Sequence, residues 1–110
     1  MEIMKGKGQY SFGRKKILFD IEIICTRTGH EFVGETIEVD GELSRIADVV
    51  GRKEKKRMSF IKTYHDKTLH KVQCELKKRK SKTFTGTWNL FYITWDNEFM
   101  PVSGKMKIEF

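Results

Sequence analysis

Lys62 is the residue whose position in the sequence most directly suggests chemistry. It lies between Phe60 and Tyr64 in an alternating segment, so all three side chains share one face of an extended strand. An inward-facing lysine loses its hydration unless it is paired, and it could anchor the carboxylate or phosphate of a bound molecule. Two structural explanations stand beside this one. An internal carboxylate such as Glu38 or Asp20 pairs with Lys62, or the face points outward and the lysine is solvated.

Aromatic residues at alternating positions in other segments suggest what would surround such a lysine. We predict a ligand-contacting set that consists of Lys62, Tyr64, Phe60, Trp88, Tyr10 and His70. Rings of this kind would equally fill the interior of a small domain, because protein interiors are close-packed. The sequence leaves open whether the rings line a pocket or form a solid core.

Two runs of basic residues, at 52–57 and 77–82, are the second feature with binding potential. The chain has 22 basic and 15 acidic side chains, a formal net charge of +7 and a sequence pI of about 9.5, and such a charge attracts anionic partners over long range. We predict an anion-binding rim formed by Arg52, Lys53, Lys55, Lys56, Lys78 and Arg79. The alternative is that these residues are solvated hairpin tips that oppose aggregation.

The sequence lacks the patterns typical of catalytic and metal sites. His65 and Asp66 are adjacent, so on a strand their side chains point apart, and no serine or cysteine has a recognisable base partner. The histidines and cysteines lack the spacing of a zinc site, and Cys25 and Cys74 fit reduced, buried thiols better than a disulfide framework. We therefore expect no enzymatic activity, no metal and no cofactor.

Period-two alternation recurs along the whole chain, whereas helical periodicity is hard to find. This pattern predicts an all-β domain. The expected strands are Met4–Ser11, 17–26, Glu31–Val39, Ile46–Arg52, Arg57–His65, Thr68–Lys78, Thr83–Trp95 and Val102–Phe110. Residues 42–45 are expected to form a turn or a single helical turn, and Gly51 is expected at a bulge.

Eight strands joined by short turns avoid exposed edges by closing, which predicts an eight-stranded antiparallel up-and-down β-barrel. A barrel of this size either packs its lumen with side chains or holds one small ligand. Gly34, Gly86 and Gly104 inside strands indicate sharp bends or a close approach of backbone. Because alternate hairpins lie at the same end of such a barrel, both basic runs are expected to ring one mouth with Arg27 and His30.

Several of these residues together resemble a known group of barrels. The pattern comprises Phe32-x-Gly34, Asp40-Gly41, Val50-Gly51, the segment Met58 to Tyr64, Phe84-x-Gly86-x-Trp88, and Gly104. It is similar to the small calycin-type barrels, which include lipocalin-like and avidin-like domains, and the resemblance covers nearly the whole chain. It implies a ligand cavity at one barrel mouth. The chain is shorter than lipocalins, lacks their early Gly-x-Trp, and lacks the biotin-binding constellation of avidins.

At 110 residues, the chain is expected to form a single domain spanning residues 1–110. It has no apolar run of about 18 residues and no segment typical of a signal peptide, so we expect a cytoplasmic protein without a membrane partner. The leading hypothesis is a non-catalytic barrel that binds a small anionic or amphipathic ligand at its basic mouth. The alternative is a scaffold that binds an acidic protein or a nucleic acid through its basic loops. An apolar outer set, Phe91, Ile93 and Trp95, predicts a homodimer contact.

Overall fold

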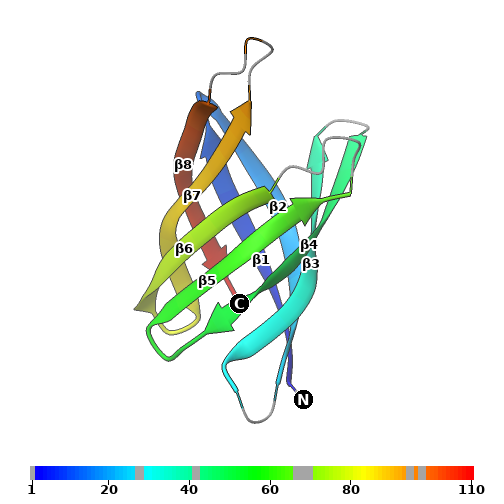
Figure 1. The fold of residues 1–110 in the computed structure, drawn as a ribbon. Coiled ribbons are helices and arrows are strands. Elements are labelled where there is room, and N and C mark those ends of the chain that lie inside the picture. Colours follow the sequence, from blue (N-terminus) through cyan, green and yellow to red (C-terminus); the bar gives the residue numbers. More distant parts are fainter. Residues whose placement is uncertain (1, 27–28, 41–42, 66–70, 94–95, 97–98) are drawn as a thin grey trace.

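The computed structural model describes residues 2–26, 29–40, 43–65, 71–93, 96 and 99–110. Eight antiparallel strands follow one another around a closed barrel, and β1 pairs with β8 to complete it (Figure 1). The strands are β1 (Glu2–Phe12), β2 (Lys15–Cys25), β3 (Glu31–Asp40), β4 (Leu43–Lys53), β5 (Arg57–Tyr64), β6 (Lys71–Lys80), β7 (Thr83–Ile93) and β8 (Phe99–Glu109). The predicted all-β, up-and-down, eight-stranded barrel is therefore confirmed.

The alternation of residue types decides which side chains enter the lumen. On β2, Phe19, Ile21 and Ile23 are buried while Asp20 and Glu22 between them are exposed. The same period holds on β5 and β6, where every second residue points inward until β6 reaches its basic end. Because successive side chains of a strand point to opposite faces, this pattern fixes the strand register around the barrel.

Glycines allow the strands to approach one another closely inside the barrel. A Cβ atom at Gly34 would overlap the carbonyl oxygen of Glu22, and one at Gly86 would overlap that of Glu75. Gly104 likewise faces the backbone oxygen of Ser11. The predicted close approach of backbone is confirmed at all three predicted glycines.

Two local expectations were wrong. Residues Leu43 to Arg45 do not form a turn, because β4 begins at Leu43 and pairs with β3 from its first residue. Gly51 is not a bulge: it has one partner on each neighbouring strand, Phe32 and Phe60. The irregularity lies on β6, where the register with β7 shifts between Lys78 and Lys80.

The barrel has two distinct ends. The β2–β3, β4–β5 and β6–β7 hairpins lie at the lower end in Figure 1, together with the start of β1 and the end of β8. The two predicted basic runs belong to this end, while Arg27 lies outside the described residues. Cys25 and Cys74 are free thiols, as expected, but only Cys74 is buried, whereas Cys25 is partly exposed. The described part of the chain contains no helix with the length and apolar character needed to cross a membrane.

Candidate functional site

A cluster of polar side chains lies inside the upper half of the barrel. Tyr10 comes from β1, Glu38 from β3, Arg45 from β4, and Lys62 and Tyr64 from β5. Glu38 and Lys62 are only 3% and 1% exposed, so both charges lie within the core. Alternation places each of these residues on the inward face of its strand.

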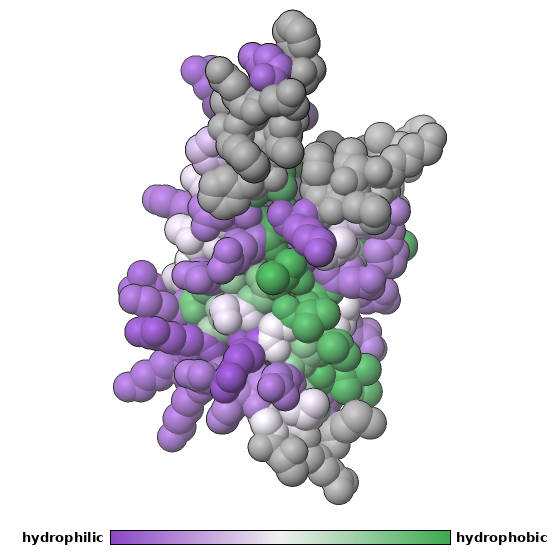
Figure 2. Space-filling model, in the orientation of Figure 1, coloured by the Kyte–Doolittle hydropathy of each residue, from purple (hydrophilic) through white to green (hydrophobic). Residues whose placement is uncertain are grey.

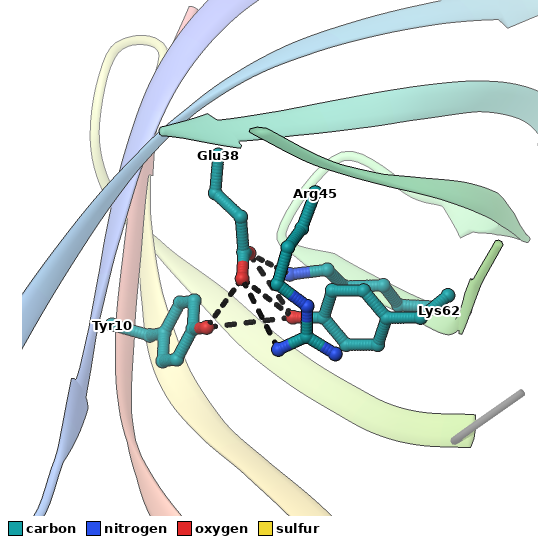
Figure 3. Close-up of polar contacts among 5 residues, drawn as sticks. Tyr10, Glu38, Arg45 and Lys62 are labelled. Atoms are coloured by element: carbon teal, nitrogen blue, oxygen red, sulfur yellow. Dashed lines mark hydrogen bonds and ion pairs between the residues drawn. The ribbon is translucent and has the colours of Figure 1, made fainter. Parts of the chain in front are cut away.

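The Glu38 carboxylate is the centre of this cluster (Figure 3). Lys62 donates to its Oε2 atom at 3.0 Å, and the Tyr10 hydroxyl donates to Oε1 at 2.9 Å. The Tyr64 hydroxyl lies 3.0 Å from Oε2, and an Arg45 guanidinium nitrogen lies 3.8 Å from Oε1. Of the two carboxylates considered as partners for Lys62, Glu38 is the one that pairs with it.

Burial shifts the ionisation of the groups around Glu38. Desolvation lowers the pKa of Lys62 from its ordinary value of 10.5, and the nearby Glu38 carboxylate opposes that shift. Burial also raises the pKa of Tyr10 to about 12 and raises the pKa of Tyr64 well above its ordinary value of 10.0. Both phenols therefore remain protonated donors throughout the neutral pH range.

A small void adjoins the polar cluster. It measures about 80 Å³, and the side chains around it include Phe12, Arg45, Tyr64 and Trp88. Binding sites for drug-sized ligands usually measure roughly 300–1,000 Å³. The void can therefore accommodate only a molecule of a few heavy atoms without movement of its walls.

The predicted ligand-contacting set is only partly brought together. Trp88 joins the cluster, since its ring lies 5.7 Å from that of Tyr10 and its indole nitrogen donates to the Ser11 carbonyl at 3.0 Å. Phe60 instead packs against Phe32, with ring centroids 6.0 Å apart. His70 lies outside the described residues. Neither Phe60 nor Phe32 lines the void.

The predicted rim does not share a site with Lys62. The cluster around Glu38 lies near the C-terminal ends of β1 and β3, toward the end of the barrel opposite the lower hairpins (Figure 1). At the basic end the lumen is filled: Phe84 packs edge to face with Phe110, and the Lys53 ammonium lies 5.7 Å from the Phe84 ring. A ligand held by Lys62 would thus be separated from the basic hairpins by packed rings.

The basic hairpins do come together on the outside of the barrel. The Lys78 amide donates to the Lys56 carbonyl at 2.9 Å, which joins the β4–β5 hairpin to β6. A groove of about 530 Å³ lies there, and it is lined by Lys56, Arg57, Lys77, Lys78, Arg79, Lys80 and Ser81. Figure 2 shows hydrophilic side chains crowded over this end of the molecule. The predicted rim residues Lys56, Lys78 and Arg79 thus line one surface.

The positive surface continues along the outside of β6, β7, β8 and β1. A second groove of about 570 Å³ crosses these strands, and its outward side chains are those of Gln9, Ser11, Lys16, Arg79, Thr85, Thr87, Lys105 and Lys107. None of the described residues that line this second groove carries a carboxylate. We call Lys16, Lys77, Arg79, Lys105 and Lys107 the basic face.

Arg79 lies at the junction of the grooves, at a bulge in β6. The register with β7 shifts between Lys78 and Lys80, so Arg79 is the extra residue on β6. The Arg79 Nε atom donates to the Thr85 hydroxyl on β7 at 2.9 Å. Arg79 also lines a third groove of about 630 Å³, so this residue borders all three grooves.

Several residues of these sites were missed in the sequence. Arg45 was placed in a turn, although it alternates with Ala47 and Val49 on the inward face of β4. Lys105 and Lys107 were not among the predicted binding residues. Their pairing with Thr87 and Thr85, which places them beside Arg79, depends on the register of β7 and β8.

The chain was compared with protein-family models, with curated proteins and with solved structures, and none of the three comparisons finds a match.

Proposed function

We propose that this protein is a non-catalytic module that binds the phosphate backbone of a nucleic acid on its basic face. The groove that contains Arg79, Lys105 and Lys107 supports this proposal most strongly, because basic and hydroxyl side chains alternate there without a lining carboxylate. Lys, Arg, Ser, Thr and Gln side chains are the groups that usually contact phosphate oxygens. The Lys107 ammonium is partly neutralised by Glu109 at 3.0 Å, so Arg79 and Lys105 are the stronger candidates for direct contact.

The composition of the basic face favours a phosphate polymer over an acidic protein. Stable protein interfaces have an apolar, well-packed core surrounded by a polar rim. The outward side chains of the groove are instead basic, hydroxyl or amide groups. Electrostatic binding to a phosphate backbone requires no apolar core, because release of condensed counterions supplies much of the affinity.

The packed lumen supports the role of a rigid scaffold. Seventeen hydrophobic residues of the described part of the chain form one buried cluster, and Glu38 already neutralises Lys62 within it. A closed antiparallel barrel is compatible with the calycin-type resemblance, which we retain as a hypothesis about ancestry. In this proposal the barrel holds the outer side chains in place, and contact with the partner occurs on the surface.

Charge reversal on the basic face tests the proposal. We would measure the anisotropy of labelled DNA and RNA, duplex and single-stranded, with the wild-type protein and with Arg79→Glu/Lys105→Glu. The control, Lys5→Glu/Lys71→Glu, changes the net charge equally but lies off the basic face. We expect the basic-face variant to lose roughly tenfold or more in affinity, while the control loses much less.

Two outcomes would contradict the proposal. Equal losses in both variants would mean that binding follows net charge rather than the basic face. Binding to polyglutamate without binding to any nucleic acid would point to an acidic protein partner instead.

The void beside the polar cluster supports a second candidate function, the binding of a small anionic or amphipathic molecule. Arg45 lies 4.0 Å above the Tyr64 ring and borders the void together with Trp88. Native mass spectrometry of protein purified from its host would reveal a bound molecule as a reproducible mass adduct. We expect Trp88→Ala and Lys62→Ala to lose that adduct, and a bare wild-type mass would remove this candidate.

A further inference from the structure

A continuous row of exposed hydrophobic side chains crosses the outside of five strands. The strand register makes each member a direct neighbour of the next, and the row runs Ile3, Ile24, Val33, Val50 and Ile61. Their exposed fractions are 60%, 36%, 53%, 60% and 49%. Figure 2 shows hydrophobic side chains gathered over β3 to β5, on the part of the surface where this apolar row lies.

The apolar row is too extended to be a chance scatter of surface residues. Neighbouring strands lie about 4.8 Å apart, so five strands give a row about 19 Å long. Single exposed hydrophobic residues are common, whereas contiguous exposed patches typically mark an interaction surface. Ile37 and Ile46, which pair across β3 and β4 and are 40% and 39% exposed, form a second apolar pair that Glu35 and Asp48 separate from the row.

Opposite charges flank the apolar row on β4. Asp48 lies two residues from Val50 on one side and Arg52 lies two residues away on the other, so all three point outward. The present partners of these charges are exposed surface groups: His65 lies 2.9 Å from Asp48, and Glu54 lies 3.8 Å from Arg52. Exposed polar contacts of this kind contribute little and are readily exchanged.

This pattern is self-complementary under a two-fold rotation. If the axis runs along the apolar row, Val50 meets Val50 of a second copy and Asp48 meets Arg52 of that copy. On β5, Ser59 and Thr63 flank Ile61 and would meet in the same way. The same rotation over β3 would oppose Glu31 and Glu35, so the charges place the contact over β4 and β5.

We infer that the apolar row binds a second copy of this chain, forming a two-fold symmetric dimer centred on Val50 and Ile61. This inference goes beyond the proposed function and does not depend on it. Much of the basic face, including Lys105 and Lys107 on β8, lies on strands outside the contact. The dimer would therefore keep positively charged surface exposed on both copies.

Sedimentation velocity over a range of protein concentrations, without nucleic acid, tests the central contact. We expect the wild-type chain to form dimers and Val50→Lys to weaken the dimer at least about a hundredfold, because symmetry applies the substitution twice. Leu18→Lys is the matched control, since Leu18 is 63% exposed on β2 but does not belong to the row. The control is expected to dimerise like the wild type.

A charge exchange tests the symmetry of the contact. Asp48→Arg alone would place arginine against arginine in the dimer, and Arg52→Asp alone would place aspartate against aspartate. Each variant is therefore expected to be monomeric, whereas an equimolar mixture forms a heterodimer with both pairs restored. A monomeric wild type, a Val50→Lys variant that dimerises normally, or a mixture that stays monomeric beside a dimeric wild type would overturn the inference.

Discussion

Glu38 occupies the position in which an anionic ligand of the upper half of the barrel would be expected. Its carboxylate accepts hydrogen bonds from Tyr10, Tyr64 and Lys62, so the chain supplies its own anion to these donors. A buried charge is tolerated when it is both paired and hydrogen-bonded. At the scale of single residues, the cluster is therefore a balanced network in which each member depends on the others.

Removing one partner of the buried pair should reveal this dependence. Lys62→Met leaves the Glu38 carboxylate buried without its cation, and we expect a loss of about 3–5 kcal/mol in the free energy of unfolding. Adding Glu38→Gln removes the uncompensated charge and should recover more than half of that loss. Urea denaturation of the wild type and both variants measures the effect. Additive losses in the double variant would show that the two residues do not interact.

The raised pKa values of the buried tyrosines predict instability in alkaline solution. The native Tyr10 phenol keeps its proton up to a pKa of about 12, whereas the unfolded phenol releases it near 10.0, and Tyr64 is shifted in the same direction. The folded state then binds more protons than the unfolded state, so stability falls as pH rises. The lowered pKa of Lys62 has the opposite effect, but only below 10.5.

We therefore expect the free energy of unfolding to decrease between about pH 10.5 and 12, with Tyr10 contributing on the order of 2 kcal/mol. Chemical denaturation at a series of pH values measures this decrease. The Tyr10→Phe variant lacks the titrating group, so its stability should fall less steeply over the same range. Parallel curves for the two proteins would contradict the role of Tyr10.

The sequence suggested an inward Lys62, because its neighbours at alternate positions are large and apolar, but it also allowed an outward, solvated face. It was not sufficient to choose between Glu38 and Asp20 as the partner, since that choice depends on which strand face each carboxylate occupies. Asp20 points outward and lies 3.1 Å from the Lys7 ammonium. The size of the void beside the cluster depends on the packing of rings from several strands, which alternation alone does not specify.

At the scale of elements, the strands were predictable where alternation is regular and were missed where it is interrupted. The start of β4 was assigned to a turn because Leu43, Ser44 and Arg45 follow an Asp-Gly pair and contain only one apolar residue. Pairing with β3 nevertheless extends to Leu43. The bulge at Arg79 was also missed, because a run of four basic residues gives no sign of which one is extra.

Gly8 on β1 illustrates a requirement imposed by a neighbouring element. A Cβ atom at this position would overlap the ring of Phe19 on β2, which is only 4% exposed. We expect Gly8→Ala to destabilise the protein by about 1–3 kcal/mol through overpacking. In a Phe19→Leu background the same substitution should cost much less. Thermal unfolding of the four proteins forms a double-mutant cycle, and equal costs in both backgrounds would exclude this explanation.

At the scale of the whole molecule, the barrel separates two kinds of surface that the linear sequence interleaves. The apolar row lies on the outside of β1 to β5, and the basic face lies mainly on the outside of β6 to β8. The net charge and the two basic runs are evident from the sequence, but this separation depends on the strand register around the closed barrel. The predicted dimer contact at Phe91, Ile93 and Trp95 stays a prediction, because their side chains lie outside the described part of the structure.

The basic face makes a quantitative prediction about salt. If five basic side chains contact phosphates of a DNA duplex, the logarithm of the binding constant should fall with the logarithm of salt concentration with a slope of about −4 to −5. Arg79→Ala should reduce the magnitude of the slope by about 1. Fluorescence titrations at several salt concentrations measure both values. A slope near zero would exclude binding driven by phosphate contacts.

The closure of the barrel has a kinetic consequence. Seven of the eight strand pairings join sequence neighbours, whereas the β1–β8 pairing joins the two ends of the chain through only four residue pairs, from Lys7–Glu109 to Tyr10–Met106. Above this seam, the Lys105 amide donates to the Ser11 hydroxyl at 3.0 Å. Contacts between such distant residues incur the largest loop-closure entropy, so they are expected to form last during folding and to open first. Amide hydrogen exchange along β8 would then report how often the β1–β8 pairing breaks and the closed barrel becomes an open sheet.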